Sequence, residues 1–149
     1  MIAYGSERLT QDCDCAVVAE NERMVAAVLQ PLGYLFKERY STFSRYTHLG
    51  HRRPVVDVML LNSSTFEKLR AESQEIELDG YSLRAPKPLH LVALKLHALK
   101  QNPDRLGKDW EDILFLLQTF TWSREEFLEL AQRYASENTL RMLREIGLL

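Results

Sequence analysis

The run Pro54–Leu61 constrains the fold of this chain more than any other stretch. After the proline it reads VVDVMLL, a continuous series of aliphatic residues interrupted by one acid. A run of this length and composition is typical of a β-strand covered on both faces. Burying an unpaired carboxylate is costly, so Asp57 has to lie at an exposed strand end, meet a cation, or be protonated. The cation could be a metal ion or a nearby arginine such as Arg52 or Arg53.

A pair of acids, Asp12 and Asp14, opens a second apolar strand with the sequence DCDCAVV. Because side chains alternate along a strand, the two carboxylates project from the same face, roughly 6 to 7 Å apart. Both can therefore reach one divalent cation. The alternative is that these acids belong to a polar turn before the strand. If this strand lies beside that of Asp57, three carboxylates converge on a site suited to hard divalent ions.

The two cysteines, Cys13 and Cys15, lie on the opposite face of the same strand, together with Val17. They are separated by one residue, and the sequence lacks the further ligands of a zinc site with the usual spacing. We therefore expect them to be small core residues.

Length and composition predict one domain with its own core, since 46% of the 149 residues are hydrophobic. Lys and Arg number 19 against 21 Asp and Glu, so the chain is not a general polyanion binder and any affinity for phosphate must be local. With no charged leader and no run of eighteen apolar residues, we expect a cytoplasmic protein without a membrane partner.

Positive charge concentrates between Tyr34 and Pro54, where Glu38 is the only acid. The basic residues of this segment are Lys37, Arg39, Arg45, Arg52 and Arg53. A basic edge beside an acidic metal centre would attract the phosphates of a nucleotide or an RNA end. An ordinary solvated face explains the same residues equally well.

Periodicity predicts an α/β (α+β) fold with a small mixed sheet flanked by helices and a helical C-terminal part. We expect helices over Glu20–Leu32 and Ser64–Arg70, aromatic-rich strands over Tyr34–Tyr40 and Thr42–His48, and C-terminal helices over Leu89–Lys100, from Lys108, from Ser123 and over Thr139–Ile146. Asp79-Gly80 between two alternating segments predicts a β-hairpin. Within a single domain, 1–149, residues 1–86 would form mainly the sheet core with the acidic site and residues 87–149 the C-terminal helices.

Lys95 stands in a predicted helix that is apolar on nearly every side. An amine in such a helix has to extend to the surface, or meet acids or phosphate. Asp109 and Asp112 lie three residues apart in the first turn of the next helix, hence on one face. Acids at that position also suit the positive end of the helix dipole.

Taken in order, these motifs resemble the minimal nucleotidyltransferase superfamily. The matching residues read YGxxRxTxDxD at 4–14, VDV at 56–58, APxPxxLxALKLxA at 85–98 and KDxxDI at 108–113. The most similar branch is the AbiEii-type group, which includes nucleotidyltransferase toxins of bacterial toxin/antitoxin systems.

The resemblance implies metal-dependent transfer of a nucleoside monophosphate from a nucleoside triphosphate to a hydroxyl of an RNA, protein or small-molecule acceptor. Asp12, Asp14 and Asp57 would bind two Mg²⁺ ions. Phosphate contacts would come from Arg8, Thr10 and Lys95, with Asp109 orienting Lys95 or the substrate. An antitoxin partner is implied by the AbiEii-type branch.

One feature of the family, a glycine-containing turn before the paired acids, is not found in this sequence. Its members carry a Gly-Gly or Gly-Ser turn well before the paired acids, where it helps to hold the nucleotide phosphates. Met1 lies only eleven residues before Asp12, and Gly5-Ser6 is too close to the acids to be that turn. We therefore expect either a start upstream of Met1 or a catalytically inactive module of this fold that binds a partner.

Overall fold

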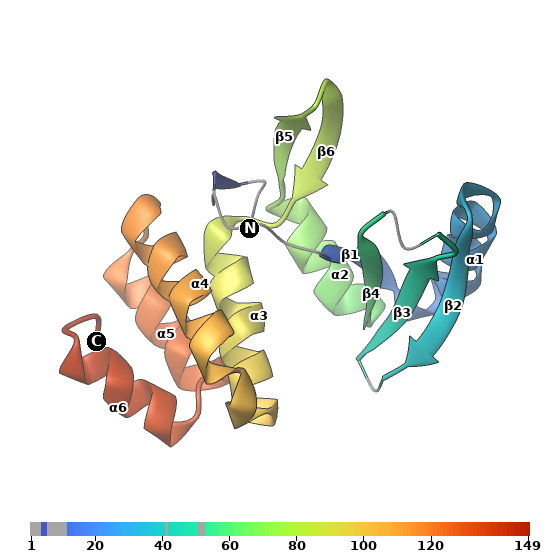
Figure 1. Ribbon diagram of the computed structural model, residues 1–149. Coiled ribbons are helices and arrows are strands. Elements are labelled where there is room, and N and C mark those ends of the chain that lie inside the picture. Colours follow the sequence, from blue (N-terminus) through green and yellow to red (C-terminus); the bar gives the residue numbers. More distant parts are fainter. Residues whose placement is uncertain (1–3, 6–11, 41, 51–52) are drawn as a thin grey trace. The chain divides into compact units, whose positions relative to one another are not determined.

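The computed structural model describes residues 4–5, 12–40, 42–50 and 53–149 (Figure 1). The chain divides into two compact units. The sheet unit comprises residues 7–72, and the helical unit comprises residues 73–149 together with the N-terminal segment around Tyr4. The predicted α/β class, a small mixed sheet with helices and a helical C-terminal part, is confirmed.

Four strands form the sheet unit, in the order β1-β4-β3-β2. Their bounds are β1 Asp12–Val18, β2 Tyr34–Arg39, β3 Phe43–His48 and β4 Val55–Leu61. Strand β4 pairs in parallel with β1 and antiparallel with β3, and β3 pairs antiparallel with β2. Strand β4 is therefore an inner strand, with hydrogen-bonded neighbours along both of its edges.

Helix α1 (Glu22–Leu29) covers one face of the sheet. Short 3₁₀ turns at Ala19–Asn21 and Gln30–Leu32 flank it, so the region predicted as one helix consists of three pieces. The apolar cluster between helix and sheet is centred on Tyr34, Tyr46 and Val58 and includes Val17, Val25, Ala26, Leu29, Val56 and Leu60. Helix α2 (Ser63–Ala71) follows β4 and completes the unit.

Two local features attach α1 to the strands. The Glu22 carboxylate accepts hydrogen bonds from Ser44 and Arg39, which belong to β3 and β2. Gly33 leads into β2 with φ of 84°, and a Cβ on it would lie 3.0 Å from the His48 ring. Glycine adopts this backbone conformation without a steric penalty, so the entry to β2 depends on it.

The cysteines share a face with Val17, as predicted, but their assignment to the core is wrong. Cys13 and Cys15 are both exposed free thiols. The apolar cluster under α1 includes Val17 but neither cysteine. Desolvation, followed by the charges of Cys13, Asp14 and Asp57, raises the pKa of Cys15 to about 11. Its thiol is therefore protonated at neutral pH.

The helical unit begins with a hairpin and continues with helices. Its elements are β5 Gln74–Leu78, β6 Tyr81–Ala85, α3 Pro88–Gln101, a 3₁₀ turn at Pro103–Arg105, α4 Leu106–Thr119, α5 Arg124–Tyr134 and α6 Glu137–Glu145. The predicted hairpin turn is confirmed, because Asp79 and Gly80 both have positive φ, as a type I′ turn requires. The hairpin belongs with the helices rather than with the four-stranded sheet.

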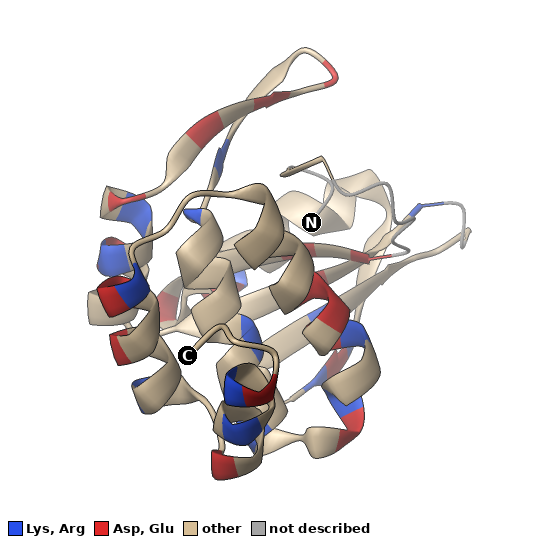
Figure 2. Cartoon of the chain, turned by 90° about the vertical axis from the view of Figure 1, so that its left-hand side faces the viewer, with Lys and Arg blue, Asp and Glu red and all other residues tan. Residues whose placement is uncertain are grey.

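An apolar core holds this unit together, with Leu96, Ile113, Leu116, Phe127 and Leu143 at 1% exposure or less. Tyr4 joins it through an edge-to-face contact with Phe120, at 5.5 Å between ring centroids, and its hydroxyl donates to the Pro86 carbonyl. Acidic and basic residues are interspersed along the helices in Figure 2, in keeping with the balanced charge of the chain. In the part of the chain that the structure describes, no helix has the length and apolar character needed to cross a membrane.

Candidate functional site

Strand register brings the three predicted metal-binding acids to one face of the sheet. Asp14 is the direct partner of Asp57 in the parallel pairing of β1 with β4, and Asp12 precedes Asp14 by two residues. Paired residues on neighbouring strands project to the same side, and such strands lie about 4.8 Å apart. The acids therefore emerge from the face opposite the apolar cluster under α1.

Position in the sheet explains the different exposure of these acids. Asp57 lies on the inner strand β4 and is 9% exposed, whereas Asp14 lies on the edge strand β1 and is exposed. Asp12, at the start of β1, is intermediate. The neighbouring thiol of Cys13 has a raised pKa, because of desolvation first and of the negative charges of Asp14 and Asp12 second.

Arg45 supplies the cation that a buried Asp57 needs. It is the partner of Asp57 in the antiparallel pairing of β3 with β4. Its Nε lies 2.8 Å from Asp57 Oδ1 and its Nη2 lies 2.6 Å from Asp57 Oδ2, a two-pronged interaction. The hydrogen bonds to Asp57 raise the pKa of Arg45 further above its already high value.

An arginine partner for Asp57 was one of the sequence alternatives, and the structure confirms it, but Arg45 was not identified as that partner. The examples named were Arg52 and Arg53, which are neighbours of Asp57 along the chain, and Arg52 lies outside the described residues. Arg45 was visible as part of the basic segment, but its link to Asp57 depends on the register between β3 and β4. That register is a long-range property of the sheet.

The chemistry of the donor set suits a hard divalent ion, since three carboxylates share one face. However, no group of three His, Cys, Asp or Glu side chains among the described residues has the geometry of a metal-binding site. Both oxygens of Asp57 accept hydrogen bonds from Arg45. Asp57 could join Asp12 and Asp14 at an ion only after the guanidinium shifts.

Arg8 and Thr10, the predicted phosphate contacts before β1, lie outside the described residues.

In the helical unit, Lys95 meets two acids of α4. Its Nζ lies 3.0 Å from Asp109 Oδ1 and 2.6 Å from Asp112 Oδ2. Arg105 donates from Nε to the other Asp109 oxygen at 2.7 Å. The side chains of Asp109 and Asp112 are 1% and 5% exposed, so this is a buried ion-pair network.

The network fixes the charge state of Asp109. Burial alone raises the pKa of Asp109, but the hydrogen bond from Arg105 and the charge of Lys95 outweigh it and hold the pKa below its usual value. Among the alternatives for Lys95, contact with acids is the one that the structure displays. A contact between Lys95 and phosphate remains a prediction, as does a role for Asp109 in orienting substrate.

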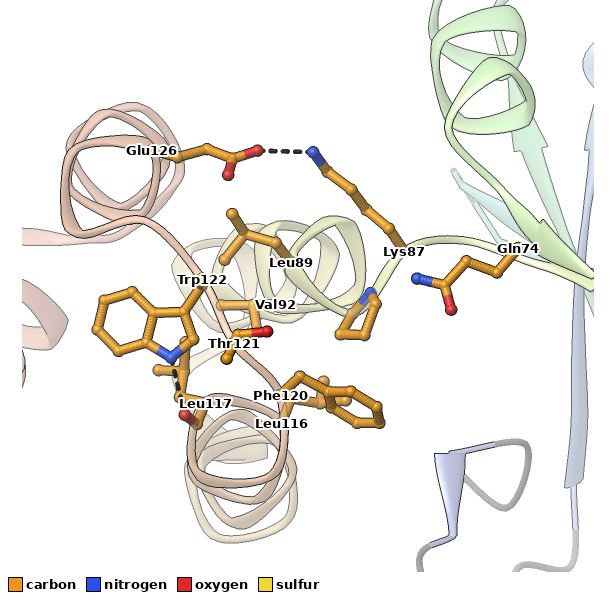
Figure 3. A pocket seen from close by; sticks show the side chains of 11 residues that line it. Gln74, Lys87, Leu89, Val92, Leu116, Leu117, Phe120, Thr121, Trp122 and Glu126 are labelled. Atoms are coloured by element: carbon orange, nitrogen blue, oxygen red, sulfur yellow. Dashed lines mark hydrogen bonds and ion pairs between the residues drawn. The ribbon is translucent and has the colours of Figure 1, made fainter.

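A small pocket of about 120 Å³ lies within the helical unit (Figure 3). Most of its lining is apolar, including Leu89, Val92 and Phe120. Lys87 and Glu126 form an ion pair of 2.6 Å on one side, and the Trp122 indole donates to the Leu117 carbonyl. The charged groups of the lining thus neutralise each other, and the pocket offers an apolar surface rather than a reactive group.

Two solved structures have a fold similar to that of this chain. The solution structure of the antibiotic-resistance factor ANT(2'')-Ia matches with a TM-score of 0.67 and 14% identity, covering 93% of this chain and 77% of that one. The crystal structure of an antigenic nucleotidyltransferase-like protein from Paracoccidioides brasiliensis matches with a TM-score of 0.50 and 13% identity, covering 89% and 73%. No profile of a known protein family and no curated protein matches the sequence. The similarity thus establishes a nucleotidyltransferase-like fold.

Proposed function

We propose that this protein transfers a nucleoside monophosphate from a nucleoside triphosphate to a hydroxyl group of an acceptor. The observation that carries the proposal is the pairing of Asp14 with Asp57 in a sheet of nucleotidyltransferase-like fold. With Asp12 on the same face, this pairing gives three carboxylates for divalent ions, as the resemblance to minimal nucleotidyltransferases implies.

In the proposed reaction the acceptor oxygen attacks the α-phosphorus, and the bond from that phosphorus to the bridging oxygen breaks, so that pyrophosphate leaves. Bound magnesium, with two ions expected, would act as a Lewis acid toward the attacking and leaving oxygens. Asp12 and Asp14 would hold these ions. Asp57 would complete the ligand set and accept the proton of the attacking hydroxyl.

The acceptor follows from similarity rather than from a residue of this chain. The resemblance allows an RNA, a protein or a small molecule as the acceptor, and its AbiEii-type branch implies an antitoxin as partner. The similarity in fold to an antibiotic-resistance factor supports including small molecules among the acceptors to test.

A second candidate function is a binding module of the same fold that does not catalyse. It is favoured by the Arg45 guanidinium, which engages both Asp57 oxygens and stands where a second ion would need a ligand. Such a module would retain the sheet and its acids without turning over nucleotide.

A labelling experiment separates the two functions. The full chain is incubated with Mg²⁺, each α-labelled nucleoside triphosphate in turn, and RNA, protein or small-molecule acceptors. We expect labelled product from the wild type, loss of product in Asp12→Asn and Asp14→Asn, and full activity in Glu67→Gln, which changes a side chain that is 64% exposed on α2. Product that survives Asp12→Asn contradicts the enzyme proposal, and absence of product with every acceptor favours the binding module.

A further inference from the structure

The position of Arg45 at the acidic face carries a further inference, which rests on the proposed function. The Asp57 side chain is 12% exposed and that of Arg45 is 34% exposed, so the carboxylate of this ion pair is largely withdrawn from water while the guanidinium stays partly exposed. Two hydrogen bonds from one planar guanidinium to one carboxylate form a strong and directional contact. Arg45 is therefore an integral part of the acidic face.

Two aromatic rings, those of Tyr40 and Phe43, also contact the Arg45 guanidinium. The Cζ atom of Arg45 lies 5.9 Å from the centroid of the Tyr40 ring and 5.6 Å from that of Phe43, within the range of a cation–π contact. These two rings stack on each other at 4.3 Å. The Tyr40 hydroxyl donates to Glu38 at 2.7 Å. Arg45 is thus positioned both by its acid and by a stacked aromatic pair.

The positive charge of Arg45 offsets the repulsion between the acids of this face. Asp14 and Asp57 are directly opposite each other in the β1/β4 pairing, and like charges in that arrangement repel. Arg45 supplies a positive charge beside this pair, which is the charge that a divalent ion would otherwise supply. A divalent ion on Asp57 would be repelled by the guanidinium at close range.

We infer that Arg45 is a resident cation of the acidic face, which must release Asp57 before a divalent ion can use that carboxylate. Recruitment of Asp57, and with it the complete ligand set of the proposed enzyme, requires the guanidinium to move. Arg45 is in this sense a positioning residue that regulates metal loading.

The test measures Mn²⁺ binding to the full chain without nucleotide, by electron paramagnetic resonance of the unbound ion. For the wild type we expect weak binding that Asp12→Asn abolishes. Arg45→Met should bind Mn²⁺ at least tenfold more tightly or bind an additional ion. Adding Asp57→Asn to Arg45→Met should return binding to the wild-type value, because the gain depends on that carboxylate.

Two controls keep the result interpretable. Arg45→Lys retains the positive charge but loses the two-pronged contact, so it should fold and show an intermediate gain in Mn²⁺ affinity. Glu67→Gln should bind Mn²⁺ as the wild type does. Thermal melting with and without Mn²⁺ shows whether each variant is folded, and the ion should raise the melting temperature of Arg45→Met more than that of the wild type.

The outcomes separate this inference from the proposed function. If Arg45→Met and Arg45→Lys bind Mn²⁺ like the wild type, while Asp12→Asn abolishes binding, the inference is overturned and the metal-dependent function stands. A gain that survives Asp57→Asn also overturns it, since Arg45 would then act elsewhere. If no variant and no wild-type protein binds Mn²⁺, the metal-dependent function fails as well.

Discussion

Removing the Lys95 amine should destabilise the helical unit strongly. Lys95 is 18% exposed and lies between Asp109 and Asp112, whose side chains are almost fully buried. In Lys95→Met the side chain keeps its length and apolar stem but leaves these carboxylates without their shared cation. An uncompensated buried charge of this kind costs about 3 to 5 kcal/mol.

The lower end of this range is expected here. Arg105 still donates to one oxygen of Asp109 in the variant, so the charge of that acid stays partly compensated. We therefore expect a loss of about 3 kcal/mol in the free energy of unfolding. With a denaturant slope of about 2 kcal/mol per M in urea, the midpoint should fall by about 1.5 M.

Urea unfolding at pH 7, followed by far-ultraviolet circular dichroism, measures this loss. Lys100→Met is the matched control, because Lys100 belongs to the same helix and is exposed. Combining Lys95→Met with Asp112→Asn should recover part of the stability by removing one of the two buried carboxylates that shared this cation. A Lys95→Met midpoint that coincides with that of Lys100→Met would refute the argument that this ion-pair network stabilises the fold.

Three further predictions follow from the described contacts. The pKa of Asp109 is lowered in the folded state, so its ionised form adds stability at pH values above the usual carboxyl pKa of about 4. That contribution should be lost as the pH falls through the lower pKa of the folded state. Urea unfolding from pH 6 to pH 2 should therefore show the wild type losing more stability than Asp109→Asn. The Cys15 thiol, with a pKa of about 11, should react with a disulfide reagent much more slowly at pH 7 than a free cysteine does, and equal rates would contradict the assigned environment. Gly33→Ala should lower stability by about 1 to 2 kcal/mol, whereas Gly107→Ala, in the first turn of α4, should leave stability unchanged or raise it slightly. Calorimetric melting temperatures that move equally would count against the requirement for glycine in the turn before β2.

Local sequence signals predicted the elements well. The turn that joins β5 to β6 needs positive φ at two residues, and Asp79-Gly80 is a sequence that adopts it. The alternating residues on either side indicate two antiparallel strands, so the hairpin could be predicted from a few neighbouring residues. The run from Leu89 to Lys100 likewise indicates a buried helix by its own composition, and α3 spans it. In both cases the information lies within one short stretch of chain.

Contacts between strands were harder to predict. The sequence placed Asp12 and Asp14 on one face of β1, but only the register shows that Asp14 lies opposite Asp57. The contact between Arg45 and Asp57 could not be predicted for the same reason, because it joins two strands whose register the sequence does not specify. For Cys13, alternation gave the correct face, yet burial depends on how far α1 extends over that face.

The central claim is that Asp12, Asp14 and Asp57 serve one divalent-ion site on a single face of the sheet. Paramagnetic broadening of backbone amide signals by Mn²⁺, recorded by nuclear magnetic resonance on the full chain, tests it most directly. We predict that the broadening is centred on residues 12–14 and 56–58 and disappears in Asp12→Asn. Broadening centred on another part of the chain, or unchanged in Asp12→Asn, would contradict the claim.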